Sequence, residues 1–94
     1  MTYNLEFKES ALKEWRKLDS SIREQFKKKL AERIDNPRIE SSKLSGMPDC
    51  YKIKLKSAGY RLVYQVEDAC LVVIVIAVGK REGSVVYRSA ADRL

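Results

Sequence analysis

The 94-residue chain contains no histidine and only two cysteines. Without histidine it lacks the usual general acid or base near neutral pH, and the commonest protein ligand of transition metals. Cys50 and Cys70 stand alone, with no CxxC pair and no neighbouring histidine. The sequence therefore predicts no metal site and no cofactor. We expect both cysteines to stay reduced and to behave as small apolar residues.

The chain also lacks the hydrophobic segments that direct proteins to or across membranes. Its longest apolar run, from Leu71 to Val78, has the length of a strand and not of a membrane span. The N-terminus has neither the basic region nor the apolar region of a signal peptide. No repeat, linker or low-complexity segment divides the sequence. These features predict a single cytoplasmic domain over residues 1–94 with no membrane contact.

Positive charge is what the chain has in excess, with 19 Lys and Arg against 13 Asp and Glu and a net charge of +6. Residues 51–94 carry 8 basic and 4 acidic side chains, whereas residues 1–50 carry 11 and 9. Nucleic acid is the commonest partner of a compact basic domain, and an anionic membrane is a weaker alternative. Many small basic proteins bind neither, so composition does not decide the partner.

Apolar periodicity predicts an α+β fold. Residues 3–8 alternate like a strand, and two helices follow, the first capped by Ser10 and the second opened by a capping box of Ser21 and Glu24. The unbroken apolar run 71–78 indicates a central strand buried on both faces. The order βααβββα predicts a mostly antiparallel four-stranded sheet, with two N-terminal helices packed on it and a short C-terminal helix over residues 85–94.

The most informative stretch is a predicted hairpin over residues 52–66. Lys52, Lys54 and Lys56 share one strand face, opposite the apolar face of that strand. A turn of two or four residues brings the apolar sets of both strands together and places Arg61 with the lysines, whereas a three-residue turn would mix the faces. Like charges opposed across strands are destabilising, which suggests that this face binds an anion. For Lys56, near the turn, protection of an edge strand against aggregation is the favoured interpretation, and anion binding is the alternative.

Other basic residues are weaker candidates for contacts with an anion. The run Lys27-Lys28-Lys29 is interpreted mainly as the solvated face of a helix. Tyr87 follows the last strand, and the sequence favours neither a packing role nor a functional role for it. The tyrosines of the hairpin are predicted to be core residues. The remaining candidates are Lys43, Lys80, Arg81 and Arg88.

A phosphodiester of RNA is an anion that such a site could cleave without a metal, by in-line attack of the 2′-hydroxyl. The enzyme must deprotonate that hydroxyl, stabilise the pentacovalent phosphorane and protonate the leaving 5′-oxygen. Lysine is the base available here, and a neighbouring cation such as Arg61 favours a neutral lysine. Arginine stabilises phosphoryl oxygens through its fixed fork of donors, but it is a poor general acid.

The run from Lys43 to Val66, followed by Val78-Gly-Lys-Arg81 and Tyr87, closely resembles the RelE toxins of bacterial toxin–antitoxin pairs. Residues 11–18 and the turn Asn36-Pro-Arg-Ile39 match as well, so the resemblance covers essentially the whole chain. It implies a fold similar to that of microbial ribonucleases. It also implies a toxin that enters the ribosomal A site and cleaves mRNA there without a metal.

The resemblance assigns a role to each candidate. Lys52 and Lys54 correspond to the basic pair that activates the 2′-hydroxyl, and Arg61 to a stabiliser of the transition state. Arg81 corresponds to the arginine that assists the leaving group, and Tyr87 to the tyrosine that orients the substrate. Contacts with RNA and ribosomal RNA are expected from Lys43, Lys56, Lys80, Arg88, Lys27 and Lys28. The chain departs from the family pattern at Ser45 and Gly83, where relatives carry arginine.

The partners implied by the resemblance are a RelB-like antitoxin, the 70S ribosome with mRNA and 16S rRNA, and operator DNA only through the antitoxin complex. The first alternative is the ParE branch of the same superfamily, which poisons DNA gyrase and generally lacks the basic residues and the tyrosine. This chain has the family's residue type at all five of these positions, which are Lys52, Lys54, Arg61, Arg81 and Tyr87. The second alternative is a nucleic-acid-binding module without catalytic activity.

Overall fold

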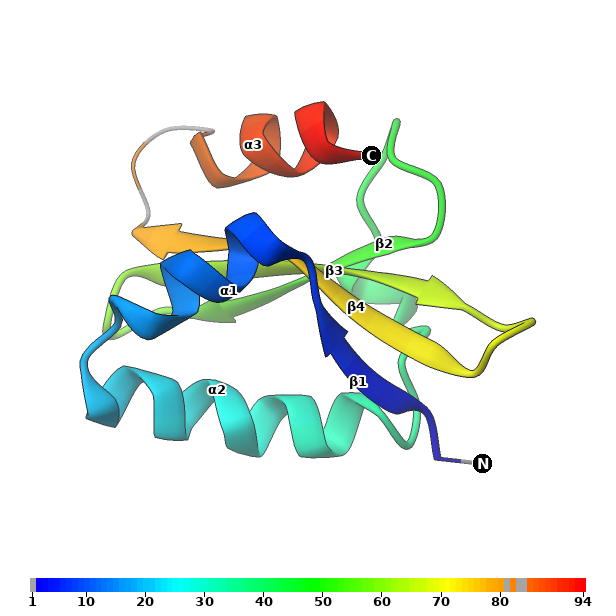
Figure 1. The fold of residues 1–94 in the computed structure, drawn as a ribbon, viewed down its shortest axis with the longest axis horizontal. Coiled ribbons are helices and arrows are strands. Elements are labelled where there is room, and N and C mark those ends of the chain that lie inside the picture. Colours follow the sequence, from blue (N-terminus) through cyan, green and yellow to red (C-terminus); the bar gives the residue numbers. More distant parts are fainter. Residues whose placement is uncertain (1, 81, 83–84) are drawn as a thin grey trace.

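The structure, a computed structural model, describes residues 2–80, 82 and 85–94. Its elements follow the order β1 (Asn4–Phe7), α1 (Glu9–Arg16), α2 (Ser20–Arg33), the 3-10 helix η1 (Glu40–Ser42), β2 (Cys50–Leu55), β3 (Tyr60–Glu67), β4 (Val72–Lys80) and α3 (Val85–Arg93). The four strands form one sheet in the order β1-β4-β3-β2 (Figure 1). The α+β class is thus confirmed, with three α-helices around a four-stranded sheet.

The sheet is mixed, so the expectation of a mostly antiparallel sheet was wrong. The pairs β2–β3 and β3–β4 are antiparallel, but β1 runs parallel to β4, with Asn4 opposite Val72 and Phe7 opposite Val75. A parallel pair needs a long crossover connection, and the segment with α1, α2 and the hairpin provides it. Alternation in residues 3–8 identifies a strand but carries no information about its partner.

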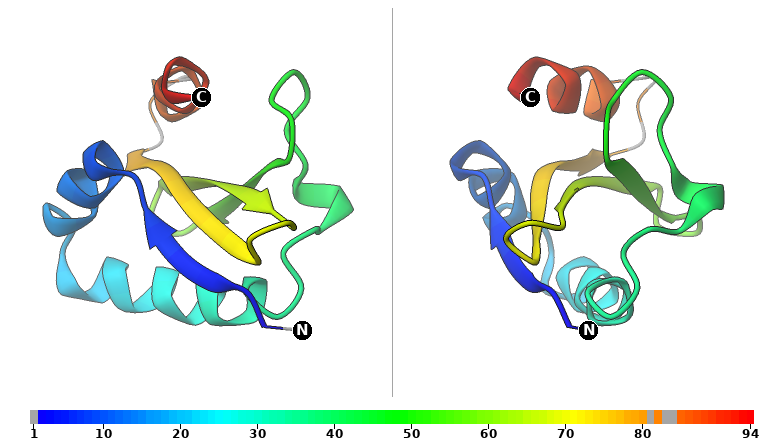
Figure 2. Two further views of the ribbon diagram at one scale, coloured as in Figure 1. Left: turned by 45° about the vertical axis from the view of Figure 1, so that its right-hand side comes forward. Right: turned by 90° about the vertical axis from the view of Figure 1, so that its right-hand side faces the viewer.

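β4 is buried on both faces, as its unbroken apolar sequence predicted. It lies between β1 and β3, with α1 and α2 on one side of the sheet and α3 on the other (Figures 1 and 2). Phe26 and Leu30 of α2 belong to the cluster on the first side, and Val86 and Ala90 of α3 to the cluster on the second. Full burial of a side chain such as Phe26 contributes about 1.5–3 kcal/mol.

Both helices of the first side begin one residue earlier than their predicted caps. α1 starts after Lys8 and α2 after Asp19, and neither of these residues forms a side-chain capping hydrogen bond. Ser10 and Ser21 therefore lie inside the first turns and do not cap them. The buried residues of α2, Ile22, Phe26 and Leu30, follow helical spacing along one stripe. Burial constrains the whole helix, whereas a cap concerns one hydrogen bond worth about 1 kcal/mol.

A bulge in β4 and two charged residues fasten α3 to the sheet. Val63 pairs with Ala77 but Tyr64 pairs with Val75, so Ile76 is an extra residue. Arg93 at the end of α3 donates a 2.8 Å hydrogen bond to the Ile76 carbonyl and forms a 2.8 Å ion pair with Glu14 of α1. This ion pair raises the pKa of Arg93. α3 is thus anchored at its C-terminal end, which fixes the helix that carries Tyr87.

The cysteines differ from each other in their surroundings. Cys50 is buried beneath α3, and burial raises the pKa of its thiol to about 11, so it stays protonated at neutral pH. Cys70 lies exposed in the β3–β4 turn, so of the two cysteines expected to behave as small apolar residues only Cys50 packs in a core cluster. Over the ranges that the structure describes, no helix has the length and apolar character needed to cross a membrane.

Candidate active site

The β2–β3 hairpin brings three predicted site residues, Lys52, Lys54 and Arg61, onto the α3 side of the sheet. Lys54 pairs with Arg61 and Leu55 with Tyr60, which leaves a four-residue turn over residues 56–59. Gly59 in this turn has φ of +71°, a conformation that glycine adopts readily. The predicted register is confirmed in its four-residue form. Arg61 also faces Gly79 of β4, so it lies in the middle of a row that crosses three strands.

Tyr87 reaches this row from α3. The guanidinium carbon of Arg61 lies 5.1 Å from the centre of the Tyr87 ring, within the range of a cation–π contact. Arg61 Nε and the Tyr87 hydroxyl are both buried, and neither has a hydrogen-bond partner among the described residues. A buried polar atom without a partner costs about 1–3 kcal/mol. An anion with several acceptor oxygens, such as a phosphate, could accept hydrogen bonds from both.

Lys52 is held from the opposite side of the sheet by Arg33, the last residue of α2. Arg33 donates to the Lys52 carbonyl oxygen at 3.2 Å, to the Tyr64 hydroxyl at 2.9 Å and to Ser42 Oγ at 3.3 Å. The Tyr64 hydroxyl in turn donates to the Pro37 carbonyl at 2.6 Å. Sequence reasoning missed Arg33, although its spacing of four residues from Lys29 indicated that both lie on one face of the helix.

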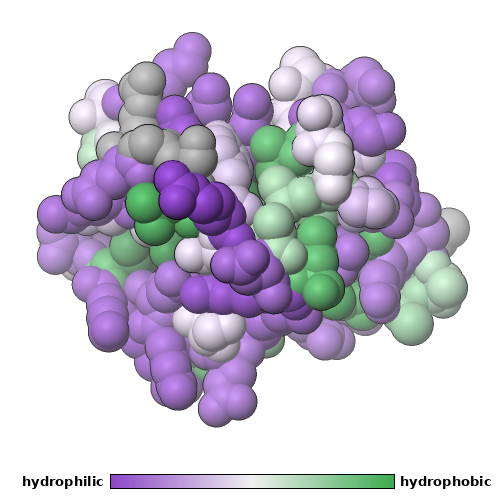
Figure 3. Space-filling view, turned by 90° about the horizontal axis from the view of Figure 1, so that it is seen from above, coloured by the Kyte–Doolittle hydropathy of each residue, from purple (hydrophilic) through white to green (hydrophobic). Residues whose placement is uncertain are grey.

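The other predicted contact residues are spread around the molecule. Lys56 is exposed in the hairpin turn, Lys80 at the end of β4 and Arg88 on α3. Lys43 is also exposed and forms an isolated bridge with Tyr51 beside β2. Arg81 and Gly83 lie outside the described residues. Seen from the α3 side, hydrophilic side chains cover most of the surface around a narrow apolar band (Figure 3).

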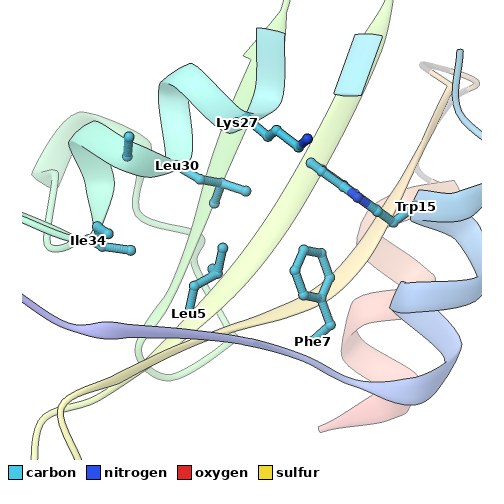
Figure 4. Close-up of a pocket in the computed structure, with 7 residues that line it drawn as sticks. Leu5, Phe7, Trp15, Lys27, Leu30 and Ile34 are labelled. Atoms are coloured by element: carbon cyan, nitrogen blue, oxygen red, sulfur yellow. The ribbon is translucent and has the colours of Figure 1, made fainter. Parts of the chain in front are cut away.

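Lys27 and Lys28 do not join this surface. Lys27 pairs with Glu24 at 3.2 Å and borders an apolar hollow of about 290 Å³ between β1, α1 and α2, on the other side of the sheet (Figure 4). Trp15 and Phe7 form much of its wall, with ring centres 5.2 Å apart. Lys28 is exposed on the outer side of α2. Among the described residues that line the hollow, Lys27 is the single ionisable side chain, and it is paired with Glu24.

No group of three His, Cys, Asp or Glu side chains that could hold a metal ion occurs in the described ranges. The groups that the structure brings together are therefore cations and a phenol: Lys52, Lys54, Arg61 and Tyr87. Such a set can bind a phosphate and stabilise negative charge on its oxygens.

Comparison with known proteins identifies the family. A family model described as "ParE toxin of type II toxin-antitoxin system, parDE" matches residues 5–84. The chain is 66% identical over 94 residues to "mRNA interferase toxin RelE" of Escherichia coli (strain K12), an alignment that covers 100% of this chain and 99% of the relative. The chain belongs to the RelE toxin family. It is also 57% identical over 94 residues to a putative RelE-like toxin of E. coli, again with 100% and 99% coverage.

Solved structures agree with this family. A free E. coli RelE toxin with two arginines replaced by alanine is similar with a TM-score of 0.93 and 65% identity, covering 100% of this chain and 99% of that one. The toxin of the intact E. coli RelBE complex has a TM-score of 0.83 and 69% identity, with coverage of 85% and 98%. The archaeal RelE–RelB complex of Pyrococcus horikoshii, at 22% identity, 88% and 99% coverage and a TM-score of 0.68, supports the fold alone.

Proposed function

We propose that this RelE toxin is the toxic component of a type II toxin–antitoxin system and cleaves mRNA in the ribosomal A site, which inhibits translation. The observation that carries the proposal is the row in which Lys54 faces Arg61 and Arg61 lies against Tyr87, with buried donors that have no described partner. This row occurs in a chain 66% identical over 94 residues to a protein named as an mRNA interferase.

The residues support attack of the 2′-hydroxyl on the adjacent phosphorus. A neutral lysine, Lys52 or Lys54, takes the 2′-hydroxyl proton, and the oxygen bonds to phosphorus as the bond to the 5′-oxygen breaks. Arg61 donates hydrogen bonds to the phosphoryl oxygens, where negative charge accumulates. Tyr87 orients the nucleotide against Arg61. The 5′-oxygen leaves as an alkoxide that Arg81 stabilises and takes a proton from water, so the products are a 2′,3′-cyclic phosphate and a 5′-hydroxyl. This role of Arg81 comes from the family resemblance.

The partners follow from the same proposal. Solved relatives include E. coli RelE in the intact RelBE complex, which supports a RelB-like antitoxin for this chain. The ribosome, its mRNA and its 16S rRNA are the proposed target in the cytoplasm, and operator DNA is contacted only through the antitoxin complex. Lys43, Lys56, Lys80 and Arg88 are the proposed contacts around the site. Lys27 and Lys28, on other sides of α2, are candidates for ribosomal RNA alone.

The test is primer extension on mRNA from cells that express the protein. We expect new 5′ ends within the codons of translated messages, because the ribosome presents the substrate. The matched control is the same message without its start codon, which should remain uncut. The matching family model is named after ParE, and the ParE branch is the alternative that poisons gyrase. Gyrase-dependent double-strand breaks with intact mRNA would contradict the proposal and favour that activity.

A further inference from the structure

A second cationic surface lies along the outer edge of β2, between this strand and α2. Two adjoining hollows of about 350 Å³ each share Lys54 and Lys56. One hollow is also lined by Arg33, Ser41, Ser42 and Lys52. The other is also lined by Lys29. We call the two hollows together the β2-edge groove. None of the described residues that line it is acidic.

The cations of the β2-edge groove form two rows with nearly equal spacing. Lys29 and Arg33 are four residues apart on α2, which places them about 6 Å apart along the helix axis. Lys52, Lys54 and Lys56 alternate along β2, at steps of about 7 Å. Arg33 lies beside Lys52 in one hollow and Lys29 beside Lys56 in the other, so the rows run alongside each other.

Within the described part of the chain, two of these cations, Lys29 and Lys56, lack the kind of ion pair that a lysine on the far side of α2 forms. Lys27 on the far side of α2 has Glu24 as its ion-pair partner. No described carboxylate forms an ion pair with Lys29 or Lys56. Arg33 is fixed in place by its three hydrogen bonds. Such an arrangement opposes like charges, which is destabilising until an anion with repeated charges neutralises them.

We propose that the β2-edge groove binds the phosphodiester backbone of the RNA strand next to the bond that is cleaved. This proposal rests on the proposed function. Lys52 and Lys54 line the groove and also belong to the candidate active site, so a strand whose scissile phosphate lies at Arg61 can continue into the groove. Ser41 and Ser42 add hydroxyl donors for phosphate oxygens. Contacts of this kind position the strand without reading its bases.

The lining of the groove favours RNA over an acidic protein segment. A bound peptide or helix is usually anchored by apolar side chains in apolar pockets. Leu55 is the single apolar residue among the described residues that line the groove. A polyanion with regularly spaced charges, by contrast, needs no apolar anchor.

Lys29→Gln tests the proposal, with Lys13→Gln as the matched control, because Lys13 is an exposed lysine of α1 that lines neither hollow. The probe is a single-stranded RNA oligonucleotide with 2′-O-methyl groups, which cannot be cleaved, and binding is measured by fluorescence anisotropy over a range of salt. Lys29→Gln should weaken binding several-fold and reduce the slope of log K against log salt by about 0.7, the value of one lost phosphate contact. Lys29→Arg should retain the binding and the slope.

On programmed ribosomes, Lys29→Gln should raise the toxin concentration that gives half-maximal cleavage but leave the saturating single-turnover rate unchanged. Equal affinity and equal salt slope for Lys29→Gln and Lys13→Gln would overturn the proposal. Weaker binding of a polyglutamate peptide by Lys29→Gln, with RNA binding unchanged, would also overturn it and make the groove a protein-docking surface. Failure of the proposed function is seen separately, as a native protein that binds the oligonucleotide but leaves ribosome-bound mRNA intact.

Discussion

Arg61→Ala is expected to slow the cleavage of ribosome-bound mRNA by about two to three orders of magnitude, the usual effect of removing one donor that stabilises transition-state charge. Arg61 lies between Lys54 and Gly79 in the sheet and against the ring of Tyr87. Its loss leaves the other site residues in place. Because the substitution also removes a buried Nε without a described partner, the free energy of unfolding should change little.

The measurement is the single-turnover cleavage rate on programmed ribosomes, together with the melting temperature of each variant. Arg61→Lys separates charge from geometry, since lysine keeps the charge but loses the planar fork of donors. Arg16→Ala is the matched control, because Arg16 is exposed on α1, away from the candidate active site. Arg81→Ala should lose a similar fraction of activity. Undiminished growth arrest by both Arg61→Ala and Arg81→Ala at equal expression would refute the proposed site.

Lys→Arg substitutions at positions 52 and 54 are expected to separate catalysis from binding. Arginine keeps the positive charge but cannot give up a proton at physiological pH, so it cannot act as a base. At the position of the true base, the cleavage rate should fall by about two to four orders of magnitude, the usual contribution of a general base. Ribosome affinity should stay nearly normal.

The two lysines must be compared in the same assay, because the hairpin places them on one face and two residues apart. Lys13→Arg, on the exposed side of α1, controls for the substitution itself. If Lys52→Arg and Lys54→Arg both cleave at the native rate, neither lysine is an obligatory base and their role is electrostatic. Loss of ribosome binding in parallel with cleavage would point to the same conclusion.

Local sequence patterns predicted the parts of the fold that depend on burial. The alternation in residues 52–66 predicted which side chains share a face of the hairpin, because a slip by one residue would have buried the lysines. It left a two-residue and a four-residue turn open, and the structure has the four-residue turn. The unbroken apolar run of β4 predicted a strand covered on both sides. What local patterns could not provide was the partner of β1, since its parallel pairing with β4 joins segments more than sixty residues apart.

The candidate site likewise has parts that local sequence patterns predict and parts that depend on contacts between distant segments. The alternation predicted that Arg61 shares a face with the lysines, but its pairing with Lys54 depends on the turn length, and the position of Tyr87 depends on α3. That helix is held by Arg93 and Glu14, which are 79 residues apart in the sequence. Likewise, the sequence could not tell which lysine of the run 27–29 faces β2. The structure turns Lys29 toward it and Lys27 away, because the buried stripe of α2 determines the rotation of the helix.

The most direct test of the account compares one mRNA in two states, naked and bound to ribosomes with an empty A site, at the same toxin concentration and physiological salt. A flexible RNA seldom presents its 2′-hydroxyl in line with the leaving oxygen, and positioning of reactants is worth up to about 7–11 kcal/mol. We therefore expect efficient single-turnover cleavage on the ribosome, negligible cleavage of the naked message, and binding that weakens steeply with added salt. Comparable rates in the two states would contradict the account and make the protein a general ribonuclease.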